Sequence, residues 1–223
     1  MAKSKASRNY KPYFIDLIVV IAGITIAFML DNLSQNKQEK RQEQLYLQAL
    51  KEDLVSDQTS LQTLMDSSQV LAKNVGEAFQ LMYSQQPVEK FESRHVISTY
   101  MAPYFSGNNG TYNALINSGD MNIISSFELK TALANHYNVS YAEIRNKDSF
   151  IRNLVDQHLY PYMLKNITFN GRTSIQSYQP LLTNEAINMM GSYLNFMNLR
   201  NEGYGQLKQK CDSLIQLIDN QLK

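Results

Sequence analysis

The chain has 223 residues and a formal net charge of +1, from 21 Lys and Arg against 20 Asp and Glu. This balance excludes a strongly basic nucleic-acid binder and an acidic disordered tail, so we expect no nucleic-acid partner. A single Cys excludes an intramolecular disulfide framework and a multi-Cys zinc site, and the low Gly (9) and Pro (5) contents argue against all-β and collagen-like classes.

The N-terminal sequence predicts a membrane-spanning helix. Residues 1–12 carry basic but no acidic side chains, and the apolar run 13–30 follows them. Eighteen helical residues span about 27 Å, close to the roughly 30 Å hydrocarbon core of a bilayer. The alternative is a cleaved signal peptide, but the run is longer than a usual signal core and no small-x-small cleavage motif follows it. We therefore expect an uncleaved signal anchor.

The charges that flank this run predict its orientation. Lys3, Lys5, Arg8 and Lys11 precede the run, and fewer basic residues lie just after it. Because Lys and Arg are enriched on the cytoplasmic side of membrane helices, we expect the N-terminus in the cytoplasm and the long C-terminal part outside it.

One face of the membrane helix carries the candidate helix-association residues, Asp16, Gly23 and Ala27. Gly23 and Ala27 have the small-xxx-small spacing that lets two helices approach closely. For Asp16 two interpretations stay open: a carboxylate at the depth of the lipid headgroups, or a residue that packs against a partner helix or handles an ion.

The rest of the chain predicts long amphipathic helices. Residues 32–45 form a polar helical neck, and a heptad-like apolar stripe typical of a coiled coil follows, ended by Gln85-Gln86-Pro87. A capping box at Ser125 and Glu128 opens a second long helix, which we expect Pro161 to end. Thr183 is the expected N-cap of the last helix. The predicted buried faces are Leu47, Leu50, Leu54, Asp57, Leu61, Leu64, Ser68, Leu71, Val75, Ala78 and Met82; then Leu129, Leu133, Tyr137, Tyr141, Ile144, Ile151, Val155 and Leu159; then Ile187, Met190, Leu194, Met197, Asn201, Tyr204, Lys208, Cys211, Ile215, Ile218 and Leu222.

Together these elements predict an all-α fold. A cytoplasmic basic tail (1–12) leads into a single transmembrane helix (13–31), which continues through the neck (32–45) into a long amphipathic helix. Residues 46–223 are expected to form an extracytoplasmic, antiparallel up-down helical bundle with essentially no sheet, because no run shows sustained alternation of apolar and polar residues.

Several motifs, in order, resemble those of a known family. They are the run Ile15–Ala27, the pair Asp31-Asn32, the segment Tyr46–Leu54 and the segment Tyr112–Gly119. Over about residues 13–160 the chain is similar to the single-pass membrane proteins of Bacteroidota grouped as the domain of unknown function 6090 family. The resemblance implies an anchored, mainly helical protein, and it supplies no reaction, ligand or active site. We expect the protein in the bacterial inner membrane, with its C-terminal domain in the periplasm.

No catalytic motif stands out, so we expect no enzymatic activity, cofactor or metal. The sequence lacks H-E-x-x-H, G-x-S-x-G and Walker A patterns. His136 and His158 lie roughly 30 Å apart along one predicted helix, too far to share a metal, and His95 stands alone. Cys211 falls on a predicted buried face. The tyrosines near the distal connections are either core residues or a partner surface; they are Tyr100, Tyr104, Tyr112, Tyr160 and Tyr162.

Three functions stay open from the sequence. The first is a structural or interaction protein that assembles with itself or with a partner membrane complex. The second is a sensor whose outer domain binds a ligand. The third is an accessory subunit of an ion-driven membrane complex that uses Asp16, because Phe14-Ile15-Asp16 is locally similar to the stator subunits of such motors.

Overall fold

The computed structural model describes residues 11–170 and 174–223, and the side chains of these residues except 11–18 and 174. The predicted basic tail up to residue 10 and the side chain of Asp16 therefore lie outside the described residues. The elements, in chain order, are α1 (Lys11–Tyr83), η1 (Val88–Lys90), α2 (Ser93–Ile97), η2 (Ser98–Tyr100), α3 (Gly110–Ser118), η3 (Asp120–Ile123), α4 (Phe127–Ala134), η4 (Asn135–Ser140), α5 (Tyr141–Leu154), η5 (Val155–Leu159), α6 (Tyr160–Asn166), β1 (Phe169–Asn170), β2 (Ser174–Ile175), η6 (Gln179–Leu182) and α7 (Asn184–Leu222).

The chain divides into two compact units, Met1–Leu45 and Tyr46–Lys223. In the first unit, every described side chain from residue 19 to residue 41 is exposed, and the apolar ones lie on all sides of α1. The hydroxyl of Thr25 donates to the carbonyl of Ile21 at 2.8 Å, so this polar group is satisfied within the helix. This helix is long and apolar enough to cross a membrane, judged by length and composition.

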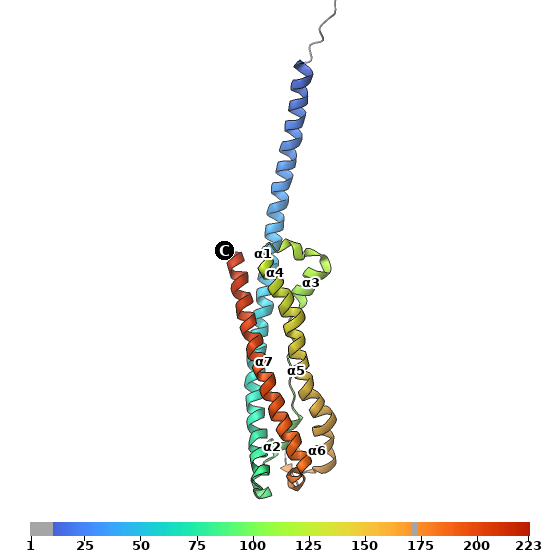
Figure 1. Cartoon of the computed structure of the whole chain (residues 1–223), viewed down its shortest axis with the longest axis vertical. Helices are drawn as coiled ribbons and strands as arrows, with labels where there is room; N and C mark the ends of the chain where they lie inside the picture. Colours follow the sequence, from blue (N-terminus) through green and yellow to red (C-terminus); the bar gives the residue numbers. More distant parts are fainter. Residues whose placement is uncertain (1–10, 171–173) are drawn as a thin grey trace, which may run out of the picture. The chain divides into compact units, whose positions relative to one another are not determined.

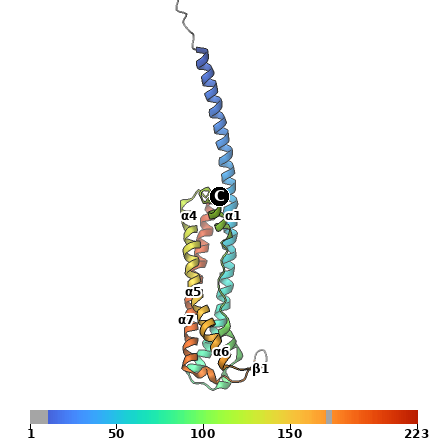
Figure 2. The same cartoon turned by 90° about the vertical axis from the view of Figure 1, so that its right-hand side faces the viewer.

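The second unit is a bundle of three long helical stretches. They are α1 from Tyr46 onward, the continuous stretch from α4 to α6, and α7, which lie side by side in both views (Figures 1 and 2). The pairs Lys51–Asp219 and Ser68–Arg200 show that α7 runs antiparallel to α1. The hydrogen bond of Tyr204 to Asp148 and that of Lys210 to Ser140 show the same for α7 and the α4–α6 stretch.

The all-α prediction is confirmed, with one refinement of the up-down order. Because α7 is antiparallel to both other stretches, α1 and α5 run in the same direction. The chain returns between them through the extended residues 101–109 rather than through a long helix. The only strands in the described chain, β1 and β2, are two residues each and pair antiparallel.

The predicted apolar faces are largely the core. On α1 every residue of the predicted stripe is buried except Leu64, which is half-buried, and every residue of the predicted face from Leu129 to Leu159 is buried. On α7 the prediction is half right. Met190, Met197, Tyr204, Cys211 and Ile218 are buried, but the second row lies one residue earlier than predicted. Its members are Ala186, Tyr193, Arg200, Leu207 and Leu214.

Two helix ends differ from the prediction. Pro161 does not end its helix, because η5 is a π-helix in which the amide of Tyr160 bonds to the carbonyl of Val155, five residues back. Pro161 then lies in the first turn of α6, where its missing N–H costs no hydrogen bond. The N-cap of α4 is Ser126 rather than Ser125, since its hydroxyl accepts from the amide of Leu129 at 3.2 Å.

The predicted N-cap at Thr183 is confirmed, and a glycine ends another helix. The Thr183 hydroxyl accepts from the amide of Ala186 at the start of α7, at 3.2 Å. Gly119 ends α3 with a left-handed φ of 79°, a conformation that glycine adopts without a Cβ penalty.

Candidate functional site

A polar layer crosses the core of the second unit. The buried apolar residues fall into two clusters, and the residues that separate them on α1, α5 and α7 are Ser68, Asp148 and Arg200. One guanidinium nitrogen of Arg200 donates to the Ser68 hydroxyl at 2.7 Å, and the other donates to the carbonyl of Pro103 at 2.5 Å. The Asp148 carboxylate lies 3.9 Å from Arg200 and accepts from the hydroxyl of Tyr204 at 2.5 Å.

A second buried acid lies on α1. Asp57 is fully buried and accepts from the hydroxyl of Tyr141 and from both the backbone amide and the side-chain amide of Asn108, at 2.8 and 2.9 Å. Buried carboxylates are tolerated only with such partners, because an unpaired charge in a core is costly. Asp57 therefore joins α1, the start of α5 and the extended segment in one network.

These side chains fix the extended segment 101–109 by its backbone. The carbonyl of Met101 accepts from the Tyr193 hydroxyl at 2.7 Å, and the amide of Phe105 donates to Asp148 at 3.2 Å. Arg200 also donates to the carbonyl of Pro103, and the amide of Asn108 donates to Asp57. Side chains of the helices thus provide the hydrogen-bond partners that a neighbouring strand would provide in a sheet. Segment 101–109 is therefore held in place by hydrogen bonds from the side chains of the bundle.

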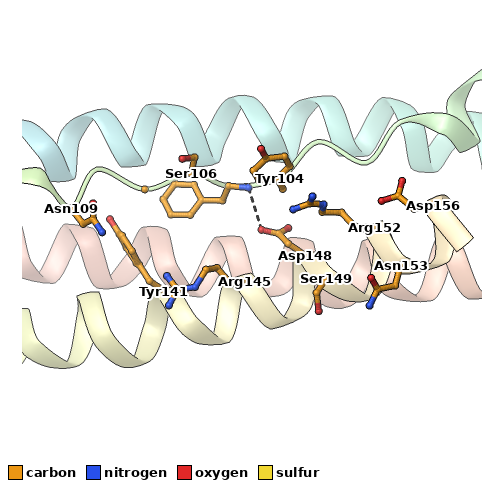
Figure 3. Close-up of a pocket in the computed structure, with 12 residues that line it drawn as sticks. Tyr104, Ser106, Asn109, Tyr141, Arg145, Asp148, Ser149, Arg152, Asn153 and Asp156 are labelled. Atoms are coloured by element: carbon orange, nitrogen blue, oxygen red, sulfur yellow. Dashed lines mark hydrogen bonds between the residues drawn. The ribbon is translucent and has the colours of Figure 1, made fainter.

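A cleft of about 510 Å³ opens between this segment and the face of α5 (Figure 3). Gly107 is required at its wall, because a Cβ there would lie 2.7 Å from the hydroxyl oxygen of Tyr141 and nearer still to its ring. Arg145 and Arg152 lie on either side of Asp148 in Figure 3. The guanidinium of Arg152 lies 4.6 Å from the ring centre of Tyr104, a cation–π contact.

Burial governs the electrostatics beneath the cleft. It raises the pKa of Asp148 above its ordinary value, against hydrogen bonds from Tyr204 and Phe105 and the charge of Arg200, all of which favour the carboxylate. Burial likewise raises the pKa of Asp57, against the hydrogen bonds from Tyr141 and Asn108. Their hydrogen-bond partners make both acids structural anchors, and Asp148 also lines the cleft.

An aromatic cluster surrounds Asp57, and a π-helix shapes it. Within η4 the consecutive residues His136 and Tyr137 are both buried, and Tyr137 stacks on Tyr112 with ring centres 4.5 Å apart. Nε2 of His136 lies 3.9 Å from Sγ of Cys211. Burial lowers the pKa of His136 to about 4 and raises that of the Cys211 thiol to about 12, so both groups are neutral at pH 7.

The model of the family of unknown function DUF6090 matches residues 16–164 of the chain. The chain belongs to this family. The family match covers both walls of the cleft and the acids Asp57 and Asp148, whereas α7, with Arg200 and Tyr204, lies beyond it. No curated protein and no solved structure matches the chain.

The structure describes two of the three predicted helix-association residues. Gly23 and Ala27 are exposed on α1, and a Cβ added at Gly23 would meet no atom within 4 Å. The side chain of Asp16 lies outside the described residues. The proposal that these residues meet a partner helix stays a prediction.

The five tyrosines do not gather on one surface. Tyr112 is buried in the aromatic cluster, and Tyr104 lies at the cleft. Tyr100 contacts Tyr160 edge-to-face with ring centres 5.4 Å apart, and the hydroxyl of Tyr162 donates to the carbonyl of Pro180 at 2.7 Å. Tyr104 and Tyr112 therefore lie in different surroundings from Tyr100, Tyr160 and Tyr162.

Sequence reasoning missed the polar layer and the cleft. Asp57 and Ser68 already interrupt the predicted stripe of α1, and these interruptions were the one available signal. Asp148 lies between Ile144 and Ile151 at the helical spacing of the predicted apolar face, but no neighbouring residue in the sequence indicates that it is buried. Among the described residues, no group of three His, Cys, Asp or Glu side chains could hold a metal ion.

Proposed function

We propose that this member of the DUF6090 family is a membrane-anchored interaction protein without catalytic activity of its own. In this proposal α1 crosses the bacterial inner membrane once, the N-terminus is cytoplasmic, and the helical bundle of the second unit lies in the periplasm. The bundle and the membrane helix then join copies of the chain, or a partner membrane complex, into an assembly.

The observation that carries the proposal is the exposure of the apolar part of α1. Val19, Ile24, Phe28 and Leu33 are each more than half exposed, and they point to different sides of the helix. In water such a surface costs about 25 cal/mol per Å² of apolar area, whereas the acyl chains of a bilayer remove that cost. A helix that is apolar all round and has no protein cover fits a lipid environment.

The assembly part of the proposal rests on the small-residue face. Lipid chains gain little from contact with a groove at Gly23 and Ala27, whereas a second helix gains close backbone packing along it. The exposed, uncovered position of Gly23 is compatible with such an approach.

Crosslinking in membranes tests the assembly. Gly23→Leu and Ala27→Leu should each reduce the crosslinked fraction, because a leucine holds the two backbones apart. Ile21→Leu is the matched control, since Ile21 lies on the opposite side of α1 and is already large and exposed. Affinity purification in a mild detergent then identifies a partner chain, if the crosslinks are not between copies. Equal crosslinking in wild type and all three variants would contradict the proposed assembly surface.

A further inference from the structure

The cleft between segment 101–109 and α5 has a wall that hydrogen bonds hold in place, which distinguishes it from a gap left by imperfect packing. Hydrogen bonds from buried side chains hold its inner wall at Pro103, Phe105 and Asn108. Its volume of about 510 Å³ falls within the roughly 300–1,000 Å³ of sites that bind small molecules. A ligand that enters it would not have to order the wall first, which lowers the entropic cost of binding.

The side chains at the opening are rich in hydrogen-bond donors. Arg145 and Arg152 are seven residues apart, so they lie on one face of the helix about 10 Å apart along its axis. Neither forms an ion pair with any residue that the structure describes. The guanidinium of Arg152 lies over the ring of Tyr104, 4.6 Å from the ring centre, and it has N–H donors to offer an anion.

The exposed donors of the cleft, rather than its net charge, favour an anionic ligand. The cleft is lined by two arginines and by two acids, Asp148 and Asp156. Asp148 is buried and already takes hydrogen bonds from Tyr204 and Phe105, and Arg200 lies behind it at 3.9 Å. The charges of the lining residues cancel, but Arg200 compensates the buried Asp148, so the two exposed arginines face one exposed acid, Asp156. Ser149 and Asn153 also line the cleft and add neutral hydrogen-bond donors (Figure 3).

We propose that this cleft binds a small organic anion, with its carboxylate or phosphate group between Arg145 and Arg152 and its ring or short apolar body against Tyr104 and Tyr141. Guanidinium groups bind carboxylates and phosphates through paired N–H donors, and an aromatic wall favours a flat or apolar body. The site goes beyond the proposed assembly and does not depend on it.

Ligand-observed NMR on the full chain in uncharged maltoside micelles tests the site. The probes are inorganic phosphate, phenyl phosphate and 4-fluorobenzoate, with 4-fluorobenzyl alcohol as the neutral control. Wild type should broaden the three anion signals in a saturable way, with phenyl phosphate bound more tightly than inorganic phosphate because of its ring. The alcohol should show only the linear broadening of micelle partition.

Substitution of the arginines decides the assignment. The double variant Arg145→Gln/Arg152→Gln should weaken anion binding about tenfold or more, since charge-assisted hydrogen bonds are lost. Arg41→Gln removes the same charge from an exposed position outside the second unit and should bind as wild type does. Circular dichroism checks the fold, and the single variants replace the double variant if its helical signal falls.

Two results would overturn the proposal: no saturable broadening of any of the three anions by wild type, or equal binding by the double variant. Equal crosslinking in wild type and in the Gly23→Leu and Ala27→Leu variants, with anion binding intact, would instead refute the assembly and leave the cleft as a binding site.

Discussion

Helix α1 carries two kinds of apolar sequence, one exposed and the other buried in the bundle. Residues 19–41 are exposed on every side, although this stretch contains the most apolar run in the chain. From Leu47 to Met82 the same helix alternates apolar residues at spacings of three and four and buries that row. The arrangement of apolar residues, more than their number, therefore decides whether a helix needs lipid or a protein partner.

The second part of α1 also buries two polar side chains within its apolar row. Asp57 and Ser68 lie in the buried row, and each has hydrogen-bond partners from α5, α7 or the extended segment. A bundle can supply such partners to a helix, whereas a single helix in lipid has to satisfy its polar groups internally, as Thr25 does.

The largest expected effect separates the two parts of α1 directly. Leu61→Ala removes a fully buried side chain and should lower the free energy of unfolding of the full chain in micelles by about 2–5 kcal/mol. Leu30→Ala, the same change at a position that is 63% exposed, should leave this free energy unchanged. Denaturant unfolding followed by circular dichroism measures both. Equal effects would mean that the two parts of α1 do not differ in packing.

A smaller effect is expected from the polar member of the buried row. Asp57→Ala leaves the Tyr141 hydroxyl and the Asn108 amide without their acceptor, at a cost of about 1–3 kcal/mol. Asp57→Asn keeps one carbonyl oxygen for Asn108 and removes a buried charge, so it should cost less. The same unfolding experiment ranks the two variants, and a more stable Asp57→Ala would show that the network does not anchor the segment.

The smallest expected effect depends on pH. Because burial lowers the pKa of His136 in the folded chain to about 4, the unfolded chain binds more protons between pH 4 and 6.5, and stability falls as the pH is lowered through this range. The loss from pH 7 to 5.5 should be about 1 kcal/mol. Asp57 and Asp148 have raised pKa values and act in the opposite direction.

The difference between wild type and His136→Gln isolates the histidine from these acids. His136→Gln should retain more of its own pH 7 stability at pH 5.5 than wild type does. Identical pH dependence of the two chains would contradict a buried neutral histidine at this position.

Much of the fold could be predicted from local patterns. The stripe of α1 and the face from Leu129 to Leu159 follow from apolar spacing alone, because a core-facing helix has to repeat its apolar residues near every 3.6 positions. The caps at Thr183 and Gly119 follow from local backbone chemistry.

The parts that sequence reasoning missed depend on non-local pairing. On α7 the spacing fits two neighbouring rows equally well, and Arg200 lies in the buried one because Ser68 and Pro103 supply its acceptors. Pro161 is accommodated only because η5 shifts the helical register by one residue. Segment 101–109 has no periodic signal of its own, since side chains of distant helices hold its backbone. The cleft could not be predicted for the same reason.

We propose that the chain crosses the membrane once, at α1, with the second unit outside the cytoplasm. Single cysteines at Lys5 or at the exposed Lys90, introduced in a Cys211→Ala background, can be labelled in spheroplasts with an impermeant maleimide. We expect Lys90→Cys to be labelled in intact spheroplasts and Lys5→Cys to be labelled only after lysis. Labelling of Lys5→Cys without labelling of Lys90→Cys would contradict this proposal.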